Sequence, residues 1–97
     1  MPKASDITDD SITLSWQPPK SDGGSEITNY ILEIKETRGT RWLRATRKKI
    51  KKPNFKVTGL ARGREYEFRV AAENEAGLGN FSRTSAPIVS KTPIGKF

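Results

Sequence analysis

The chain has 97 residues, of which 18 are Lys or Arg and 11 are Asp or Glu, and its net charge is +7. This length suits one small domain with a core of its own. The sequence contains neither Cys nor His, which excludes disulfides, cysteine-based metal sites and the usual general base, and which leans toward a reducing compartment. No apolar run approaches the length of a membrane helix, and Met1 directly before Pro2 leads us to expect a domain excised from a longer protein.

The positive charge is concentrated in one segment. Between Arg38 and Lys52 there are eight basic residues and no acidic one, whereas all 11 acids lie elsewhere and nearly cancel the remaining basic residues. A concentrated excess of this kind indicates a surface patch rather than general solubility. We call the eight residues the basic strip: Arg38, Arg41, Arg44, Arg47, Lys48, Lys49, Lys51 and Lys52.

The first third of the chain predicts strands on either side of a turn. A short strand is expected at "SDIT" (5–8), and the next segment, "SITLSWQ" (11–17), alternates strictly, with Ile12, Leu14 and Trp16 on one face. The segment "PPKSDGGS" (18–25) then breaks the pattern, because proline lacks a ladder donor and glycine allows turn dihedrals. Alternation returns in "ITNYILEIKE" (27–36). Its two faces are Tyr30, Leu32 and Ile34 on the inside, and Asn29, Ile31, Glu33 and Lys35 on the outside.

A shorter strand, "RWLRA" (41–45), is expected next. Successive side chains on a strand point to opposite faces, so Arg41 and Leu43 should share one face of it, and Trp42 and Arg44 the other. The segment "NFKVTGL" (54–60) is also strand-like and should point Phe55 and Val57 inward.

The clearest strand is "EYEFRVAAEN" (65–74), which follows a turn at Gly63. Its inner face should hold Tyr66, Phe68, Val70 and Ala72, and its outer face Glu65, Glu67, Arg69, Ala71 and Glu73. After the glycine-rich turn "EAGLGN" (75–80), the segment "SAPIVSKT" (85–92) reads as an irregular last strand, which Pro87 restricts to an edge or a bulge. About seven short strands without helical periodicity predict an all-β fold, a seven-stranded antiparallel β-sandwich.

Three stretches, "LSWQPPKSDGGSEITNYILEIKE", "RW" and "VTGLARGREYEFRVAAENEAGLG", together resemble a fibronectin type III domain over about residues 4–92. The family often has Pro directly before Gly63, where this chain has Arg62. The resemblance implies an immunoglobulin-like sandwich, with residues 1–3 as a leader and 93–97 as the start of an interdomain linker. Besides the strand order and the double proline, it is carried by Trp16, Tyr30, Leu60, Gly63, Tyr66, Asn74, Gly77 and Gly79.

A closer resemblance is carried by "PPKSDGG", "YILE" and "EFRVAAENEAGLG", which are similar to modules of the giant muscle proteins titin and twitchin and of myosin-binding protein C. It implies a non-catalytic structural and interaction module in the cytoplasm of the sarcomere. The isolated domain should be a monomer that contacts neighbouring modules of its own chain. The implied partners are thick-filament proteins, myosin and myosin-binding protein C among them.

Other chemistry is not supported by the residue pattern. No nucleophile, base and orienting group can be assembled without His, so we predict a non-enzyme with no catalytic, cofactor or metal site. The loop "GLGNFS" (77–82) connects strand to strand, whereas a phosphate loop leads into a helix, and "DGG" (22–24) lacks the alternating oxygen ligands of a calcium loop. Tyr66 is expected to bond backbone a few residues upstream. Asn80 begins a glycosylation sequon, which would matter only in a secreted protein.

The basic strip admits two interpretations. It is either the solvated, charged edge of a sheet, since charged side chains prevent further strands from adding there, or a docking patch for an acidic surface. Trp42 is expected to lie on the sheet under arginine stems, in a cation–π contact. The candidate partner-binding residues are therefore Trp42 and the eight residues of the basic strip.

Three functions follow from these alternatives. The first is a spacer and thick-filament docking unit in a modular sarcomeric protein. The second is an extracellular adhesion or receptor module that binds acidic glycans through residues 38–52. Nucleic-acid binding is the weakest, because base stacking wants several exposed aromatic side chains and only Trp42 lies in that segment.

Overall fold

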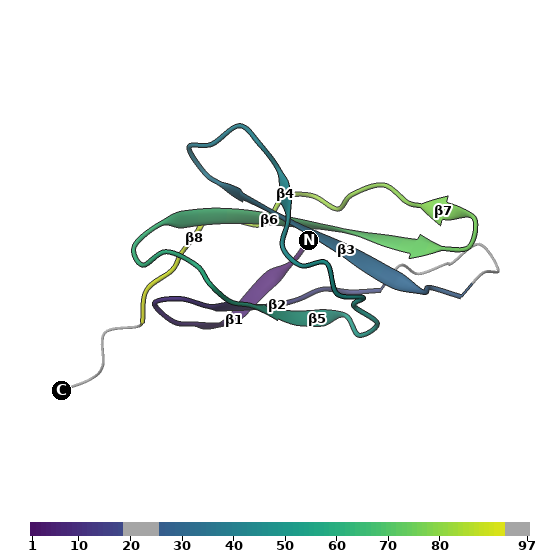
Figure 1. The fold of residues 1–97 in the computed structure, drawn as a ribbon, viewed down its shortest axis with the longest axis horizontal. Helices are drawn as coiled ribbons and strands as arrows, with labels where there is room; N and C mark the ends of the chain where they lie inside the picture. Colours follow the sequence, from purple (N-terminus) through teal and green to yellow (C-terminus); the bar gives the residue numbers. More distant parts are fainter. Residues whose placement is uncertain (19–25, 93–97) are drawn as a thin grey trace.

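The computed structural model describes residues 1–18 and 26–92, and throughout this part of the chain the secondary structure is all β. Two antiparallel sheets lie face to face (Figure 1). The predicted turn at 18–25, apart from Pro18, and the linker at 93–97 lie outside the described residues. The first sheet has the order β1-β2-β5, formed by β1 (Lys3–Ile7), β2 (Ile12–Ser15) and β5 (Asn54–Val57). The second has the order β4-β3-β6-β7, with β8 also paired to β6, and consists of β3 (Asn29–Glu36), β4 (Leu43–Arg44), β6 (Glu65–Asn74), β7 (Gly77–Leu78) and β8 (Ile88–Val89).

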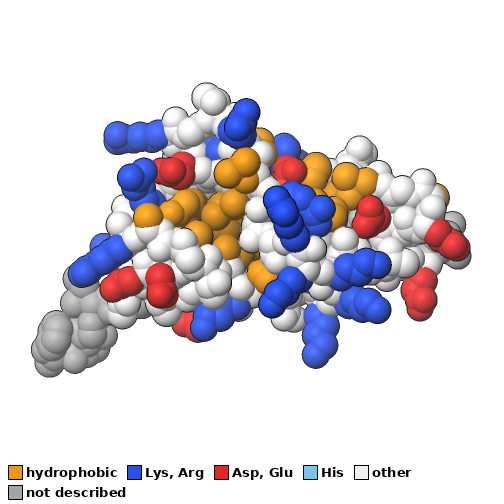
Figure 2. All heavy atoms as spheres, in the orientation of Figure 1, with side chains coloured by type: hydrophobic (Ala, Val, Ile, Leu, Met, Phe, Trp, Pro, Cys, Tyr) orange, Lys and Arg blue, Asp and Glu red, His pale blue; other side chains and the backbone are white. Residues whose placement is uncertain are grey.

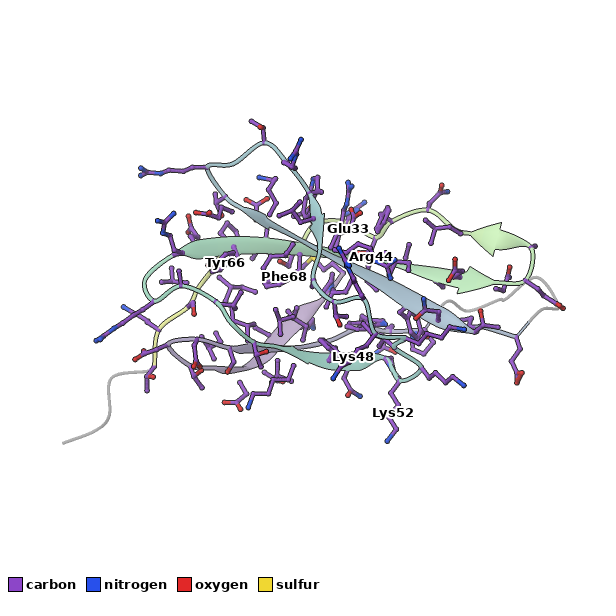
Figure 3. The ribbon with its side chains drawn as sticks, in the orientation of Figure 1. Glu33, Arg44, Lys48, Lys52, Tyr66 and Phe68 are labelled. Atoms are coloured by element: carbon purple, nitrogen blue, oxygen red, sulfur yellow. The ribbon has the colours of Figure 1, made fainter. Side chains whose placement is uncertain are left out.

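The core lies between the sheets and is built from the inward rows that alternation predicts. Phe68 at the centre of β6 is 0% exposed, and Tyr66 and Phe68 both lie between the two layers in Figure 3. Trp16 packs edge-to-face on Tyr30, with ring centroids 5.4 Å apart. The buried side chains of this cluster are Ile12, Leu14, Trp16, Tyr30, Leu32, Ile50, Val57, Tyr66, Phe68 and Val70.

The outer face of β3 and β6 is covered more fully than simple alternation suggests. Ile31 and Ala71 are paired across the two strands and lie on the predicted outer face, yet they are only 8% and 2% exposed. This sheet therefore buries apolar surface on both faces at its centre.

The last part of the chain follows the free edge of β6 irregularly, as Pro87 predicts. The backbone N–H groups of Ser82 and Ser85 donate to the carbonyls of Val70 and Phe68, both at 2.7 Å. In return, the Ser82 and Ser85 hydroxyls accept the Val70 and Phe68 N–H groups at 3.1 and 3.0 Å. The strand expected at 85–92 therefore appears only as the two-residue β8, Ile88–Val89. The other short strand on this edge, β7, lies within the predicted glycine-rich turn at 75–80.

Ser90 ties the end of the described chain to the loops beside it. Ser90 is 0% exposed, and the single proton of its hydroxyl is shared between the carbonyls of Thr8 and Asp9, which lie 3.1 and 2.9 Å from Oγ. The Thr92 N–H donates to Asp9 Oδ1 at 2.7 Å. This bond lowers the pKa of the Asp9 carboxyl, and nearby Arg62 acts in the same direction. The chain is thus held against this loop as far as Thr92.

Tyr66 makes the corner contact expected from the sequence. Its hydroxyl accepts the backbone N–H of Ala61, five residues upstream, at 3.0 Å. Between them Gly63 has a φ of 80°, a left-handed conformation that glycine adopts without steric cost. The Tyr66 side chain thereby holds the turn that enters β6.

We expect Tyr66→Phe to lower the free energy of unfolding by about 1–2 kcal/mol, because the Ala61 N–H loses its acceptor. The value lies in the lower part of the usual range since Ala61 is exposed and water can reach it. Urea denaturation of the two proteins measures the difference. Tyr30→Phe is the matched control, and a costly Tyr30→Phe beside a neutral Tyr66→Phe would show that the corner contact has been misassigned.

Candidate protein-binding surface

The basic strip runs along one edge of the sandwich and crosses from one sheet to the other. After β3 the chain loops back to β4, where Leu43 pairs with Ile34 and Arg44 with Glu33. It then descends between the layers to β5 (Figure 1). Three backbone bonds hold this crossing against the edge: Ala45 N–H to Leu32 O at 2.8 Å, Tyr30 N–H to Ile50 O at 2.9 Å, and Trp16 N–H to Pro53 O at 3.0 Å.

Ile50 is the side chain that anchors the crossing. It is 3% exposed and belongs to the core cluster, although basic residues surround it in the sequence. Its N–H donates to Asn29 Oδ1 at 2.8 Å, and Asn29 Nδ2 donates in turn to Glu73 Oε1 at 3.1 Å. With Ile50 pointing inward, Lys49 and Lys51 on either side of it are exposed.

All eight residues of the basic strip are exposed. Lys and Arg side chains gather across the middle of the face seen in Figure 2, and Lys52 points away from both layers in Figure 3. The ion pairs found within residues 1–18 and 26–92 are Lys35–Glu67, Arg62–Asp9, Arg64–Glu36 and Arg69–Glu33, and none of them uses a residue of the strip. The charge of the strip is therefore not neutralised by the described part of the protein.

The structure groups the predicted residues unevenly. Arg38 lies in the loop after β3 and lines a hollow with Gly63 and Arg64, away from the lysines. Arg41 and Arg44 lie at β4, at the edge of the β3–β6 sheet. Lys48, Lys49, Lys51 and Lys52 lie on the crossing between the layers. The strip is thus continuous along the chain and is spread over three parts of one edge.

Trp42 makes the expected cation–π contact with an arginine. The cations over its ring are Arg69 of β6, 4.3 Å from the ring centroid, and Lys35 of β3, at 5.7 Å. Neither residue belongs to the basic strip. The other neighbour of the Arg69 guanidinium is the Phe81 ring, at 4.5 Å. Trp42 is half-buried by these contacts, so it fastens the loop before β4 to the sheet and offers less surface to a partner than was expected.

Arg69 is held by charge as well as by aromatic rings. Its Nε and NH2 groups lie 2.8 and 2.7 Å from the same Glu33 oxygen, directly across the strand pair. Two residues further along β3, Lys35 Nζ lies 3.6 Å from Glu67 Oε1. On this outer face, cations and carboxylates of β3 and β6 are therefore paired with each other. The cations of the basic strip have no such partners within the described residues.

Leu43 is a surface residue that the sequence reasoning did not single out. It is 57% exposed, although it belongs to β4 and stands opposite Ile34 in the register. A signal was present, because the alternation in "RWLRA" placed Leu43 on the same face as Arg41, a residue expected to reach solvent. The structure therefore adds an apolar side chain to a surface expected to be purely basic.

No group of three or more acidic side chains that could hold a metal occurs in the described residues. The described residues also contain no helix long and apolar enough to cross a membrane.

Comparison with known proteins identifies the class. The fibronectin type III domain family matches residues 2–88, and the chain belongs to this family. Muscle proteins are among its relatives. It is 35% identical to cardiac-type myosin-binding protein C of Mus musculus over 98% of this chain, and it spans 8% of that protein.

Solved structures agree with this assignment. Domains A168-A170 of titin superpose with a TM-score of 0.88 at 43% identity, covering 94% of this chain and 30% of that one. The twitchin kinase region of C. elegans gives a TM-score of 0.88 at 35% identity, covering 99% of this chain and 17% of that one.

These comparisons confirm the predicted resemblance and the sandwich fold. The chain is a fibronectin type III module of a kind found in modular muscle proteins. The predicted limits of the domain, 4–92 with a leader and a linker, stay a prediction.

Proposed function

We propose that this module is a spacer and docking unit in a modular sarcomeric protein, and that its basic strip binds an acidic surface of a thick-filament protein, with myosin and myosin-binding protein C as the first candidates. The observation that carries the proposal is the set of eight exposed cations along one edge, none of them in an ion pair within the described residues. The relatives, which include myosin-binding protein C and titin, support the muscle setting and a cytoplasmic location in the sarcomere.

The alternative interpretation, a solvated edge, explains only part of the strip. Charged residues protect the edge of a strand whose backbone groups are unpaired. Lys48, Lys49, Lys51 and Lys52 lie on the crossing segment instead, outside any strand. Ile50 in their midst already bridges to Tyr30. Like charges held this close repel one another, so edge protection alone gives no reason to keep four of them together.

The spacer role is supported by the anchoring of the last described residues to the body of the module. Hydrogen bonds from Ser90 and Thr92 reach the loop at Thr8 and Asp9. A following module would therefore be joined to a segment that is itself held in place as far as Thr92.

Reversing the charge of Lys48, Lys49, Lys51 and Lys52 to Glu is expected to abolish binding to acidic thick-filament fragments. Wild-type binding should weaken steeply between low and physiological salt, because exposed charges are screened beyond about 8 Å at physiological ionic strength. Slower association should account for most of the loss. Folding should change little, since exposed substitutions usually fall within about 0.5 kcal/mol each. Titration of both proteins at two salt concentrations measures the effect.

A matched control carries the same change in net charge elsewhere. Lys3, Lys56, Arg83 and Lys91 are exposed and lie outside the strip, and reversing them should leave much of the binding intact. Equal loss in the two variants would mean that only the total charge matters. Strip-dependent binding to heparin without binding to the muscle fragments would overturn the proposal in favour of the extracellular, glycan-binding alternative.

A further inference from the structure

A shallow apolar hollow opens at the upper end of the basic strip. It has a volume of about 300 Å³ and is lined by the apolar parts of Ile34, Leu43 and Tyr66 and by Lys35, Glu36, Gly39, Thr40 and Arg41. The one carboxylate of this lining, Glu36, is already paired with Arg64 at 2.8 Å. Apolar side chains are visible between the two layers on this face, with Lys and Arg side chains around them (Figure 2). Tyr66 is buried, whereas Leu43 is 57% exposed at the rim.

The register of β4 explains why Leu43 is left open. Leu43 stands opposite Ile34, so it continues the inward apolar row of β3 past the edge of the sheet. Arg44, the other residue of β4, is exposed and stands opposite Glu33. Arg41, two residues before Leu43, lines the same hollow. An exposed leucine is thus flanked along the chain by two exposed arginines.

We propose that this hollow receives an apolar side chain of the partner, and that the partner segment is acidic on either side of that residue. The inference rests on the proposed function of the basic strip and specifies what it recognises. Arg41, which lines the hollow, would pair with one flanking carboxylate while Leu43 and Ile34 cover the apolar residue. Arg44, on the opposite face of β4 and outside the lining, would pair with a carboxylate of the segment that reaches across the open edge of this strand. The exposed cations favour an acidic segment by charge complementarity. The exposed leucine favours a segment that also contains an apolar residue.

A polyanion would match the charges of this surface but not its apolar part. Glycan or polyglutamate chains can neutralise the arginines, but they leave Leu43 in water. Apolar contact at the centre of a patch, surrounded by charges that exclude wrong partners, is the arrangement that gives protein interfaces their specificity. The partner class is therefore a protein segment of mixed acidic and apolar sequence.

The test uses two synthetic peptides of 12 residues, each rich in Glu and Asp. One carries two leucines near its centre, and its twin carries serines in their place. The module should bind the leucine peptide about tenfold more tightly, the factor expected for burying part of one leucine-sized contact. Leu43→Ser should remove that preference and leave binding of the serine peptide unchanged. Leu78→Ser is the matched control, because Leu78 is 50% exposed on β7, and it should keep the preference.

The outcomes separate this inference from the proposed function. Equal binding of the two peptides by the wild-type module, with both lost on reversal of the four lysines, would overturn the role of the hollow and keep the docking strip. A preference that survives Leu43→Ser would also overturn it. Binding of neither peptide would overturn both proposals. Contacts between the peptide leucine methyls and the Leu43 and Ile34 methyls, observed by NMR in the complex, would support it directly.

Discussion

Trp16→Ala is expected to lower the free energy of unfolding by about 3–5 kcal/mol, the cost of truncating a large aromatic side chain in a packed core. Trp16 is 6% exposed and packs edge-to-face on Tyr30. Its backbone N–H also donates to Pro53 O at 3.0 Å, so the cavity would open where the crossing segment meets the first sheet. Equilibrium unfolding in urea, followed by circular dichroism, measures the change.

Trp16→Phe is the informative companion to that variant. Within the described residues the buried indole N–H has no hydrogen-bond partner, and an unpaired buried donor costs free energy. Phenylalanine removes this donor while keeping most of the aromatic contact, so its cost should be well below that of alanine. Leu78→Ala, on an exposed position, should stay within about 0.5 kcal/mol. Equal costs for Phe and Ala at position 16 would contradict the packing described here.

The inner surfaces of both sheets could be predicted from the sequence, because the residues of a strand alternate between two faces and only one of the two rows is apolar. A shift of one residue would exchange the buried and exposed rows of a strand. In β6 that choice is unambiguous, since Phe68 and Val70 alternate with Glu67 and Arg69. The corner contact of Tyr66 was predicted for a different reason, since it depended on the family resemblance and not on periodicity.

Contacts on the outer face could not be predicted in the same way. Alternation assigns a residue to a face, but it does not say which residue of another strand stands opposite. Glu33 meets Arg69 only because β3 and β6 pair in one particular register. Phe81, from the irregular segment between β7 and β8, completes the stack on Arg69. These partners are distant in sequence, so no local pattern connects them.

The candidate site shows the same division. Exposure of the lysines follows from their chemistry, because a charged side chain is rarely buried without a partner. The path of the chain from one sheet to the other cannot be predicted from the charge of the lysines. It depends on Ile50, one apolar residue in a run of charges, and on the acceptor that Asn29 provides for its N–H. The exposure of Leu43 also depends on the arrangement of strands, because β4 is the edge strand of its sheet and no described strand pairs with it beyond β3.

Charge therefore has two separate uses in this module. On the outer face of the β3–β6 sheet, Arg69 is paired and stacked and belongs to the folded structure. On the edge, the basic strip remains free to meet a partner. Variants in the two places should differ accordingly, since substitutions in the strip should change binding and a substitution of Arg69 should change stability.

Arg69→Ala is expected to lower the free energy of unfolding by about 2–4 kcal/mol. Loss of charge-assisted hydrogen bonds to Glu33 should cost about 1.5–3 kcal/mol. That carboxylate would be left unpaired with its side chain 18% exposed. Loss of the two ring contacts adds about 0.5–1 kcal/mol each at partly exposed sites. The total should lie below the simple sum of these costs, because the Arg69 side chain is 30% exposed and water can replace part of what it loses. Urea denaturation gives the total.

Hydrogen exchange tests where the structure loosens. Trp42 would lose its closest cation, so the Ala45 N–H that donates to Leu32 O should exchange faster in Arg69→Ala than in the wild type. Arg69→Lys keeps the charge but loses the planar group that stacks between Trp42 and Phe81, and it should be intermediate. Arg83→Ala is the matched control, because Arg83 is an exposed arginine on the segment between β7 and β8, and it should change neither quantity. If Arg69→Ala left the free energy of unfolding unchanged, the stack of Arg69 on Trp42 and Phe81 would contribute nothing to stability. Ile50 and the backbone hydrogen bonds of the crossing would then be sufficient to hold the edge.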